Sequence, residues 1–376
     1  MDRNRRRLLQ AAGAAAVMSG LPASAAPRFE WTSVAPAEAG FAPDLAERLE
    51  AAIQAGRLPN LHGALIVHDG RLVLERYVAG EDESWGRPLG KVAFGPATLH
   101  DMRSVTKSVV SLLYGIALAA GKVAPPEAPL MDQFRDYPDL AADPARRRWT
   151  VAHALTMTLG TQWDEMSIPY SNPANSEIAM ERAPDRYRFI LDRPIVEEPG
   201  VRWIYNGGAT ALLGRMIARG TGRELPDYAR SALFEPLGID TFEWVRGMDG
   251  VTPSAASGLR LRPRDLARIG LMMAQGGQWQ GRVVVPADWL EAALQTRVRI
   301  DEIFRYGYQW YLTNLPPVGD AKRRRLVSAI GNGGQRLFIL PEAKVVVVTT
   351  FGNYNQPDQW KPPVALLRDI VLPALR

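Results

Sequence analysis

The segments of this 376-residue chain that resemble β-strands lie near its two ends, and a long stretch of different character separates them. Near the start, residues 63–68 and 71–78 are rich in β-branched and aliphatic side chains, and Asp69-Gly70 between them is typical of a tight hairpin. Near the end, the sequence predicts further strands over 306–312, 326–330, 336–340 and 344–351. We therefore expect strands from both ends to pair into one antiparallel sheet.

The helices expected from apolar periodicity lie mainly between these strands. A near-continuous apolar run over 104–120 predicts a buried helix. Shorter helical patterns surround it, and the other expected helices cover 40–56, 150–158, 175–192, 208–219, 226–233, 263–275, 286–296 and 363–375. The order predicts an α+β fold, with an antiparallel sheet flanked by helices. We expect a sheet lobe from 26–125 and 306–376 and a mostly helical insert lobe over 126–305, with the site in the cleft between them.

Residues 1–25 have the composition of an export signal. Arg5-Arg6-Arg7 precedes an apolar stretch that is too short to span a bilayer and ends at small residues suited to cleavage after Ala25. The paired arginines resemble a twin-arginine signal. We expect a periplasmic or secreted mature protein with no stable membrane span; an uncleaved membrane anchor is the alternative.

The composition argues against several kinds of site. Without cysteine, the chain cannot form a disulfide, a thiolate zinc site or a cysteine nucleophile. No two of its four histidines have the spacing of a metal-ligand motif such as HExxH. The formal net charge is +5, and much of it lies in the signal segment. We expect no metal, no cofactor and no nucleic-acid partner.

Ser104 and Lys107 stand three residues apart at the start of the expected buried helix, so their side chains share one face. At a helix N-terminus, free amides and the helix dipole favour the negative charge that develops on a reacting serine. An apolar setting favours a neutral lysine, which can take the proton of the serine. Taken alone, the pair also fits an N-capping serine followed by a surface lysine.

Two later segments carry groups that suit the same chemistry. Tyr205 stands in a loop that enters a helix, and its phenol can accept or donate a proton beside Ser104 and Lys107. The glycines of 331–334 stand at the head of a strand, where they let the backbone approach a substrate closely. Taken singly, these features also fit a core tyrosine and a sheet bulge.

In this order and spacing, Ser104-x-x-Lys107, Tyr205 and Gly333 resemble the motifs of the serine β-lactamase and penicillin-recognising superfamily, in particular the branch related to class C β-lactamases. The resemblance implies a β-lactamase/transpeptidase-like fold. It also implies that Ser104 is the acylated nucleophile, that Lys107 is its base partner, and that Tyr205 activates Ser104 and protonates the leaving group. The implied oxyanion hole consists of the backbone amides of Ser104 and Gln335.

The second and third motifs also imply substrate-binding positions, which are Asn206, Gly207, Asn332, Gly333 and Gly334. Two of them depart from the family pattern. Gly207 stands where Tyr-x-Asn commonly ends, and Asn332 stands where a lysine or histidine commonly begins the third motif. The missing side chains help the family to hold β-lactams, so the sequence is more similar to the esterase and 6-aminohexanoate-dimer hydrolase side of the branch. We predict that a small-molecule ester or small amide is hydrolysed through an acyl-enzyme.

Other functions stay open from the sequence alone. One is a β-lactamase or a D-Ala-D-Ala carboxypeptidase-like enzyme, and another is a non-catalytic exported binding protein of the same fold. His68-Asp69 could belong to a Ser-His-Asp triad, although the hairpin turn needs Asp69. The acid pairs Asp164-Glu165 and Glu197-Glu198 could suggest a glycosidase, although adjacent acids usually point apart.

Overall fold

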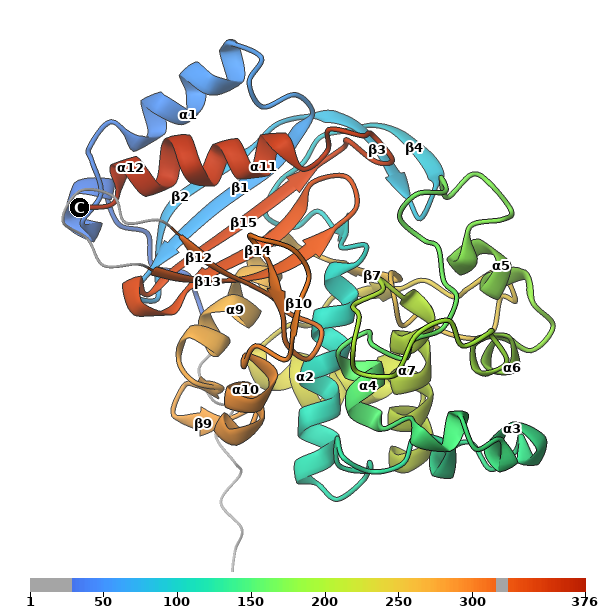
Figure 1. Ribbon diagram of the computed structural model, residues 1–376. Coiled ribbons are helices and arrows are strands. Elements are labelled where there is room, and N and C mark those ends of the chain that lie inside the picture. Colours follow the sequence, from blue (N-terminus) through green and yellow to red (C-terminus); the bar gives the residue numbers. More distant parts are fainter. Residues whose placement is uncertain (1–28, 316–323) are drawn as a thin grey trace, which may run out of the picture. The chain divides into compact units, whose positions relative to one another are not determined.

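The computed structural model describes residues 29–315 and 324–376, so the export signal predicted over 1–25 lies outside the described residues. Its largest element is an eight-stranded sheet in the order β10-β11-β12-β13-β14-β15-β1-β2. All neighbouring strands in this sheet run antiparallel. The prediction that strands from both ends form one antiparallel sheet is confirmed (Figure 1).

The strands from the two ends of the chain meet where β1 (Leu61–His68) pairs with β15 (Val345–Phe351). Every residue of β15 is buried, and its sequence is almost continuously apolar instead of alternating. A strand has this pattern when both faces of its sheet are covered. β1 continues into β2 (Arg71–Tyr77) through Asp69 and Gly70, whose φ values of 46° and 80° are those that a tight hairpin turn requires.

Helices cover both faces of this sheet (Figure 1). On one face lie α1 (Leu45–Gln54) and the last helical segment, which consists of α11 (Lys361–Ala365), a π-helical turn η7 (Leu366–Val371) and α12 (Leu372–Ala374). On the other face α2 (Val105–Ala119) and α9 (Pro263–Ala274) contact the central strands. The predicted apolar helix over 104–120 is therefore α2, and it is buried because it lies under the sheet.

The remaining strands have between two and eight residues, and β10 to β14 among them belong to the large sheet. They are β3 (Gly80–Ser84), β4 (Arg87–Val92), β5 (His100–Asp101), β6 (Glu243–Trp244), β7 (Leu259–Leu261), β8 (Gln278–Trp279), β9 (Arg282–Val283), β10 (Val298–Arg299), β11 (Arg305–Tyr306), β12 (Tyr311–Leu315), β13 (Arg324–Gly331) and β14 (Gln335–Leu340). The predicted single strand over 306–312 is wrong. It is two strands, β11 and β12, because the chain turns between them, with Gln309 in the left-handed region at φ 64°.

The other helices connect these strands and occupy most of the middle of the chain. They are α3 (Pro138–Ala142), α4 (Val151–Leu155), α5 (Ser176–Arg182), α6 (Arg186–Leu191), α7 (Gly207–Thr221), α8 (Leu225–Ala229) and α10 (Ala287–Ala293), with shorter turns η1 (Pro36–Ala39), η2 (Met131–Gln133), η3 (Arg146–Arg148), η4 (Arg230–Phe234), η5 (Glu235–Leu237) and η6 (Pro341–Ala343). The range 31–376 forms one compact unit. The division into a sheet lobe and a helical lobe stays a prediction.

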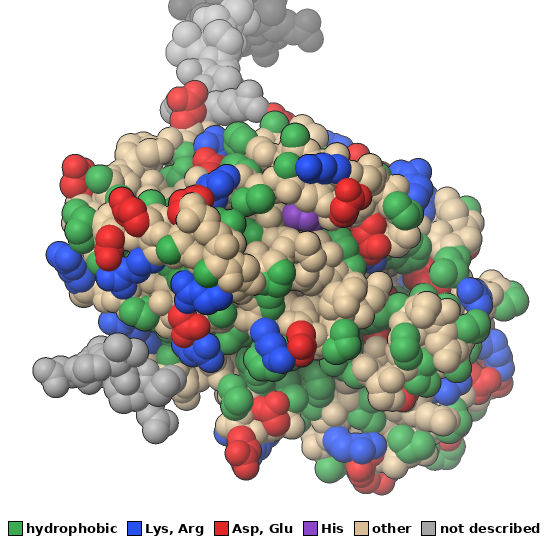
Figure 2. All heavy atoms as spheres, turned by 90° about the horizontal axis from the view of Figure 1, so that it is seen from above, with side chains coloured by type: hydrophobic (Ala, Val, Ile, Leu, Met, Phe, Trp, Pro, Cys, Tyr) green, Lys and Arg blue, Asp and Glu red, His purple; other side chains and the backbone are tan. Residues whose placement is uncertain are grey.

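No helix within 29–315 or 324–376 is both long and apolar enough to cross a membrane. On the face of the molecule that Figure 2 shows, basic, acidic and apolar side chains are interspersed.

Candidate active site

Ser104 lies at the N-cap of α2, directly after a strained residue. Arg103 has a φ of 49°, in the left-handed region that non-glycine residues rarely adopt. Its side chain is tied down by ion pairs with Glu83 and with Asp101, the latter at 3.2 Å, and its guanidinium lies 4.9 Å from the ring centre of Tyr354. These contacts hold the turn that presents Ser104.

Lys107 lies one helical turn further on and is 2% exposed. Its Nζ donates hydrogen bonds to Ser104 Oγ and to Ala256 O, both at 3.1 Å, and lies 3.8 Å from Glu165 Oε1. The prediction that this lysine is buried next to Ser104 is confirmed. The prediction of an apolar setting is wrong, because three oxygen acceptors face the amine and match the three N–H groups of an ammonium ion.

Tyr205 lies directly before Asn206, the N-cap of α7, and is also buried. Lys107 Nζ lies 4.8 Å from the centre of its ring. Burial, together with the Glu165 carboxylate, holds the pKa of Tyr205 well above its usual value, and a hydrogen bond with Ser104 acts in the opposite direction. The phenol therefore keeps its proton at neutral pH. The fold thus brings the three side chains of the predicted catalytic set together.

Two buried acids complete this group. Asp164 and Glu165 point apart, as expected for neighbours: Asp164 accepts a hydrogen bond from Ser167 N, and Glu165 points inward and is fully buried. Glu177, in α5, is also buried, and burial next to Glu165 raises its pKa to about 8. Asn175 shapes this loop by capping α5 and by donating a hydrogen bond to Ile168 O at 2.7 Å.

Sequence reasoning missed the contribution of both acids. From the sequence, Glu165 is only one half of an acid pair, and Glu177 is not a candidate. A weak signal was present, since Glu165 stands among Trp163, Ile168 and Tyr170, in a loop with large apolar side chains. The direction of each side chain depends on the path of that loop, which no periodicity encodes.

The third motif lies between β13 and β14, next to the turn that holds Ser104. A Cβ on Gly331 would lie 2.3 Å from Met102 O, so only glycine allows this approach. Gly333 and Gly334 have φ values of 92° and 103°, in the region that favours glycine. The side chain of Gln335 is fixed by hydrogen bonds to Phe351 O at 2.7 Å and from Phe351 N at 3.0 Å. The oxyanion hole from the amides of Ser104 and Gln335 stays a prediction.

The other predicted substrate-binding residues form hydrogen bonds within the protein. Asn206 is buried and its Oδ1 accepts a hydrogen bond from Ala209 N, which is the capping contact of α7. Gly207 N donates to Glu165 Oε2 at 2.7 Å. Asn332 donates through Nδ2 to Asn355 Oδ1 at 2.7 Å. Their roles in substrate binding stay predictions.

A cavity of about 340 Å³ opens beside Ser104. Its lining combines acidic, aromatic and polar side chains and consists of Glu83, Trp85, Gly86, Arg103, Ser104, Tyr170, Ser171, Glu177, Ile178, Glu181, Met248, Ser257, Asn332 and Asn355. The lining therefore includes the predicted nucleophile and Asn332 from the third motif.

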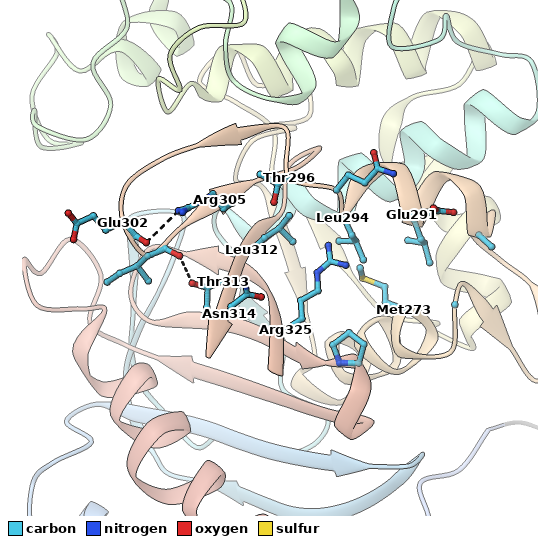
Figure 3. Close-up of a pocket in the computed structure, with 16 residues that line it drawn as sticks. Met273, Glu291, Leu294, Thr296, Glu302, Arg305, Leu312, Thr313, Asn314 and Arg325 are labelled. Carbon is cyan, nitrogen blue, oxygen red and sulfur yellow. Dashed lines mark hydrogen bonds between the residues drawn. The ribbon is translucent and has the colours of Figure 1, made fainter. Parts of the chain in front are cut away.

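A larger cavity of about 990 Å³ lies elsewhere, between the β11–β13 end of the sheet and the helices α9 and α10 (Figure 3). Met273, Leu294 and Leu312 contribute to its lining, and Thr313 there donates a hydrogen bond to Ile303 O at 2.5 Å. It contains none of the predicted site residues. We therefore place the candidate active site in the smaller cavity.

Of the alternative acid and histidine pairs, only Asp164-Glu165 contributes a side chain next to Lys107, and that side chain is Glu165. Asp69 pairs with Lys344 at 3.1 Å, at the turn of the β1–β2 hairpin, and so does not orient a histidine toward a serine. Glu198 forms an ion pair with Arg148, and both side chains are exposed.

One group of side chains in the described ranges has the composition of a metal site: His62, Asp82 and His100, all buried. His62 Nδ1 lies 2.9 Å from His100 Nε2, and His100 Nδ1 lies 3.0 Å from Asp101 O, which can only accept. His100 therefore carries its proton on Nδ1 and accepts one hydrogen bond from His62. Two nitrogens around a tetrahedral zinc ion lie about 3.3–3.4 Å apart, so the spacing fits a hydrogen-bonded pair better than a pair of metal ligands.

Comparison with known proteins supports the resemblance seen in the sequence. The family model described as Beta-lactamase matches residues 46–363. The 6-aminohexanoate-dimer hydrolase of Paenarthrobacter ureafaciens is 26% identical over 337 residues, which are 84% of this chain and 76% of that protein. The lovastatin esterase of Penicillium rubens is 26% identical over 156 residues, which are 38% of this chain and 36% of that protein.

The fold is also similar to solved structures. The structure of EstCE1, described as a hydrolase with promiscuous acyltransferase activity, aligns with a TM-score of 0.67 at 15% identity and covers 87% of this chain and 98% of that one. A penicillin-binding protein from Bacillus halodurans aligns with a TM-score of 0.61 at 17% identity, over 85% of this chain and 99% of that one. The chain therefore belongs to the beta-lactamase family and is a hydrolase related to 6-aminohexanoate-dimer hydrolase and to esterases.

Proposed function

We propose that this protein hydrolyses a small-molecule ester or small amide through an acyl-enzyme on Ser104. The observation that carries the proposal is the buried contact between Lys107 Nζ and Ser104 Oγ at 3.1 Å, with the Tyr205 ring 4.8 Å from the same amine. A nucleophile within hydrogen-bond reach of a base partner, beside a second proton donor, is the arrangement that covalent acyl transfer needs.

In the proposed reaction, Ser104 Oγ bonds to the substrate carbonyl carbon while its proton passes to Lys107 Nζ, which must be neutral to accept it. The phenol of Tyr205 gives its proton to the leaving oxygen or nitrogen, and Lys107 then returns a proton to Tyr205. Water attacks the acyl-enzyme by the reverse sequence. The amides of Ser104 and Gln335 would receive the oxyanion, and one such donor typically contributes about 3–4 kcal/mol.

The cavity supports a small substrate that carries no essential carboxylate. At about 340 Å³ it is near the lower end of ligand-binding cavities. Arg103 is the cation among its lining residues, and it already pairs with Glu83 and Asp101. Asn332, where the family commonly has a cation, is bonded to Asn355. The named relatives, one a hydrolase of an amide dimer and one an esterase, support the same two bond types.

The decisive experiment is the intact mass of the folded protein after exposure to a fluorophosphonate, followed by peptide mapping. We expect one adduct, on Ser104, that is lost in Ser104→Ala and retained in Ser171→Ala, a control serine on the same cavity wall. Folded wild-type protein without an adduct would contradict the proposal. A screen of esters before β-lactams would follow a positive result.

We also propose that the chain is exported through a twin-arginine-like signal and cleaved after Ala25. The basic residues and small-residue cleavage site of 1–25 support this proposal. N-terminal sequencing of protein from the extracytoplasmic fraction should begin at Ala26, and an intact Met1 would contradict cleavage.

A further inference from the structure

The proposed mechanism leaves one proton unaccounted for, at Lys107. The amine faces three oxygen acceptors, Ser104 Oγ, Ala256 O and Glu165 Oε1, so the resting group has the surroundings of an ammonium ion. An ammonium ion cannot accept the proton of Ser104. One proton must therefore leave Nζ before Ser104 attacks.

Glu165 is the acid that faces this amine. Its side chain has no exposed surface. Its Oε2 accepts hydrogen bonds from Gly207 N at 2.7 Å and from Trp163 Nε1 at 2.9 Å, and its Oε1 accepts one from Tyr170 OH at 3.1 Å. Because Oε2 already has two donors, Oε1 is the oxygen that is turned toward Lys107, at 3.8 Å.

The glycine at position 207 makes this placement possible. A Cβ on Gly207 would lie 3.0 Å from Glu165 Oε2 and 3.3 Å from Oε1, which is tighter than ordinary contacts. Any larger residue at 207 would have to displace the carboxylate. The glycine that departs from the Tyr-x-Asn pattern and the buried acid are therefore two parts of one arrangement.

We infer that Glu165 takes up the proton that Lys107 must release before Ser104 can be deprotonated. In this step an N–H bond of Nζ breaks, an O–H bond forms on Oε1, and the ion pair becomes a neutral amine next to a neutral carboxylic acid. No outside reactant is needed. The two atoms must approach from 3.8 Å to about 3 Å for the transfer. Burial reduces the free-energy difference between the ion pair and the neutral pair, because both charges of the ion pair are removed from water. Glu165 acts through Lys107 and is a positioning residue.

The groups around Glu165 add no second negative charge beside Lys107 at neutral pH. Glu177 faces Glu165 from α5, and its raised pKa of about 8 keeps it protonated below that pH. The other titratable groups that interact with Glu165 are phenols with raised pKa values, and they stay neutral: Tyr170, Tyr205, Tyr306 and Tyr311. The proton can therefore be exchanged within the Lys107–Glu165 pair without exchange with solvent.

The inference rests on the proposed function and is tested by the dependence of kcat/KM on pH for a chromogenic ester. In the wild-type protein the proton passes from Lys107 to Glu165 and none is released to solvent. We therefore expect kcat/KM not to rise from pH 6 to 8. In Glu165→Gln, Lys107 must lose its proton to solvent. We expect kcat/KM to rise about tenfold per pH unit over this range, and to be at least about tenfold lower at pH 7, with the loss in kcat.

Asp164→Asn is the matched control, because it removes a negative charge one residue away that does not face Lys107. We expect it to keep the wild-type pH profile. If Glu165→Gln does not fold, Gly207→Ala tests the same contact, since its Cβ would push the carboxylate away from its place, and we expect the same rise of kcat/KM with pH.

The two levels of the proposal fail in different ways. Folded wild-type protein that forms no fluorophosphonate adduct would overturn the proposed function, and the inference with it. Wild-type protein that is labelled on Ser104, together with a Glu165→Gln variant whose kcat/KM and pH profile match the wild type, would overturn the inference alone.

Discussion

At the scale of single residues, Ser104 and its partners are held by contacts that also restrict what they can do. Lys107 has one hydrogen bond to the serine and another to Ala256 O, so its Nζ cannot turn away without leaving a buried carbonyl unpaired. Tyr205 stands at the entry of α7, where the cap formed by Asn206 fixes its backbone. The contact between Lys107 and Ser104 and the backbone position of Tyr205 are therefore in place before any substrate enters.

Replacing either proton-transfer group should remove most of the activity. Lys107→Ala deletes the base partner, and Tyr205→Phe deletes only the hydroxyl that would protonate the leaving group. We expect kcat/KM for an ester to fall by roughly 10²–10⁴-fold in each variant, since this is the usual contribution of a positioned acid or base. Steady-state kinetics on folded protein provides the test, and full activity in either variant would refute the role assigned to that residue.

A second prediction at this scale concerns stability at acid pH. Burial lowers the pKa of His62 to about 3 and that of His100 to about 4, so the folded protein keeps both rings neutral. The unfolded chain takes up protons below pH about 6.5. The contribution of the pair to stability is therefore complete above that pH and is lost as the pH falls toward 4 and 3. The slope is at most about 1.4 kcal/mol per pH unit for each histidine.

Urea unfolding between pH 7.5 and 4.5 can measure this slope. In His62→Phe one of the two titrating rings is gone, and the new ring can stack on Phe94, as His62 does at 4.1 Å between ring centres. We expect this variant to be less stable at neutral pH but to lose less stability on acidification. Parallel curves for the two proteins would contradict the pKa assignments.

At the scale of elements, α2 matters most because it carries Ser104 and Lys107 and lies between the sheet and α10. Its Gly115 faces Trp289 of α10, where a Cβ would lie 2.1 Å from Trp289 Cδ1. The ring of Trp289 is itself enclosed by Tyr114 and Tyr308, at 5.8 Å and 5.5 Å between ring centres. Because Gly115 has no side chain, the ring of Trp289 can lie directly against α2.

Gly115→Ala should destabilise the protein even though alanine is the better helix former. The overpacking cost of about 1–3 kcal/mol exceeds the propensity gain of about 1 kcal/mol. Gly95→Ala is a suitable control, because nothing lies within 4 Å of its added Cβ and its φ is not positive. Chemical denaturation compares the two variants. Equal midpoints would show that α10 yields to the new methyl group.

The elements also show why only part of the site can be predicted from the sequence. Ser104 and Lys107 share a helix, so their spacing alone fixes their proximity. Tyr205 can be located from the sequence because it directly precedes the N-cap of α7, the next long helix. Glu165 lies in a loop whose sequence has no periodicity. It approaches Lys107 because Asn175 donates a hydrogen bond to Ile168 O within this loop and Gly207 N donates one to the Glu165 carboxylate. The two-residue strands β5 and β6 are too short to show any alternation, so they also cannot be predicted.

At the scale of the whole molecule, most of the sheet could be predicted because its strands β1, β2, β13, β14 and β15 are long and rich in apolar residues, whereas the two-residue strands β10 and β11 at one edge could not. The last helical segment could be predicted for a related reason, since its apolar residues recur at helical spacing. Leu366, Leu367, Ile370 and Val371 are all buried in the cluster that also includes Leu45 of α1. These residues close one face of the sheet.

A chain that ends after Trp360 lacks this cover and should not fold cooperatively. The four buried aliphatic side chains contribute about 1.5–3 kcal/mol each, so their loss is comparable to the total stability of a typical domain, about 5–15 kcal/mol. We expect low soluble yield and no sharp thermal transition by circular dichroism. Removal of Arg376 alone should leave the transition in place, and a cooperative transition in the shorter chain would contradict the prediction.

The pairing of β1 with β15 has a consequence for folding during synthesis on the ribosome. β1 and β2 are synthesised early, yet β15, which pairs with β1, is made only after the 267 residues of 78–344. Until then an apolar hairpin has an unpaired edge, which is a template for pairing with other chains. Folding must also wait for contacts that are distant in sequence, which slows it. We therefore expect the first hairpin to be open to pairing with other chains until synthesis of β15 ends.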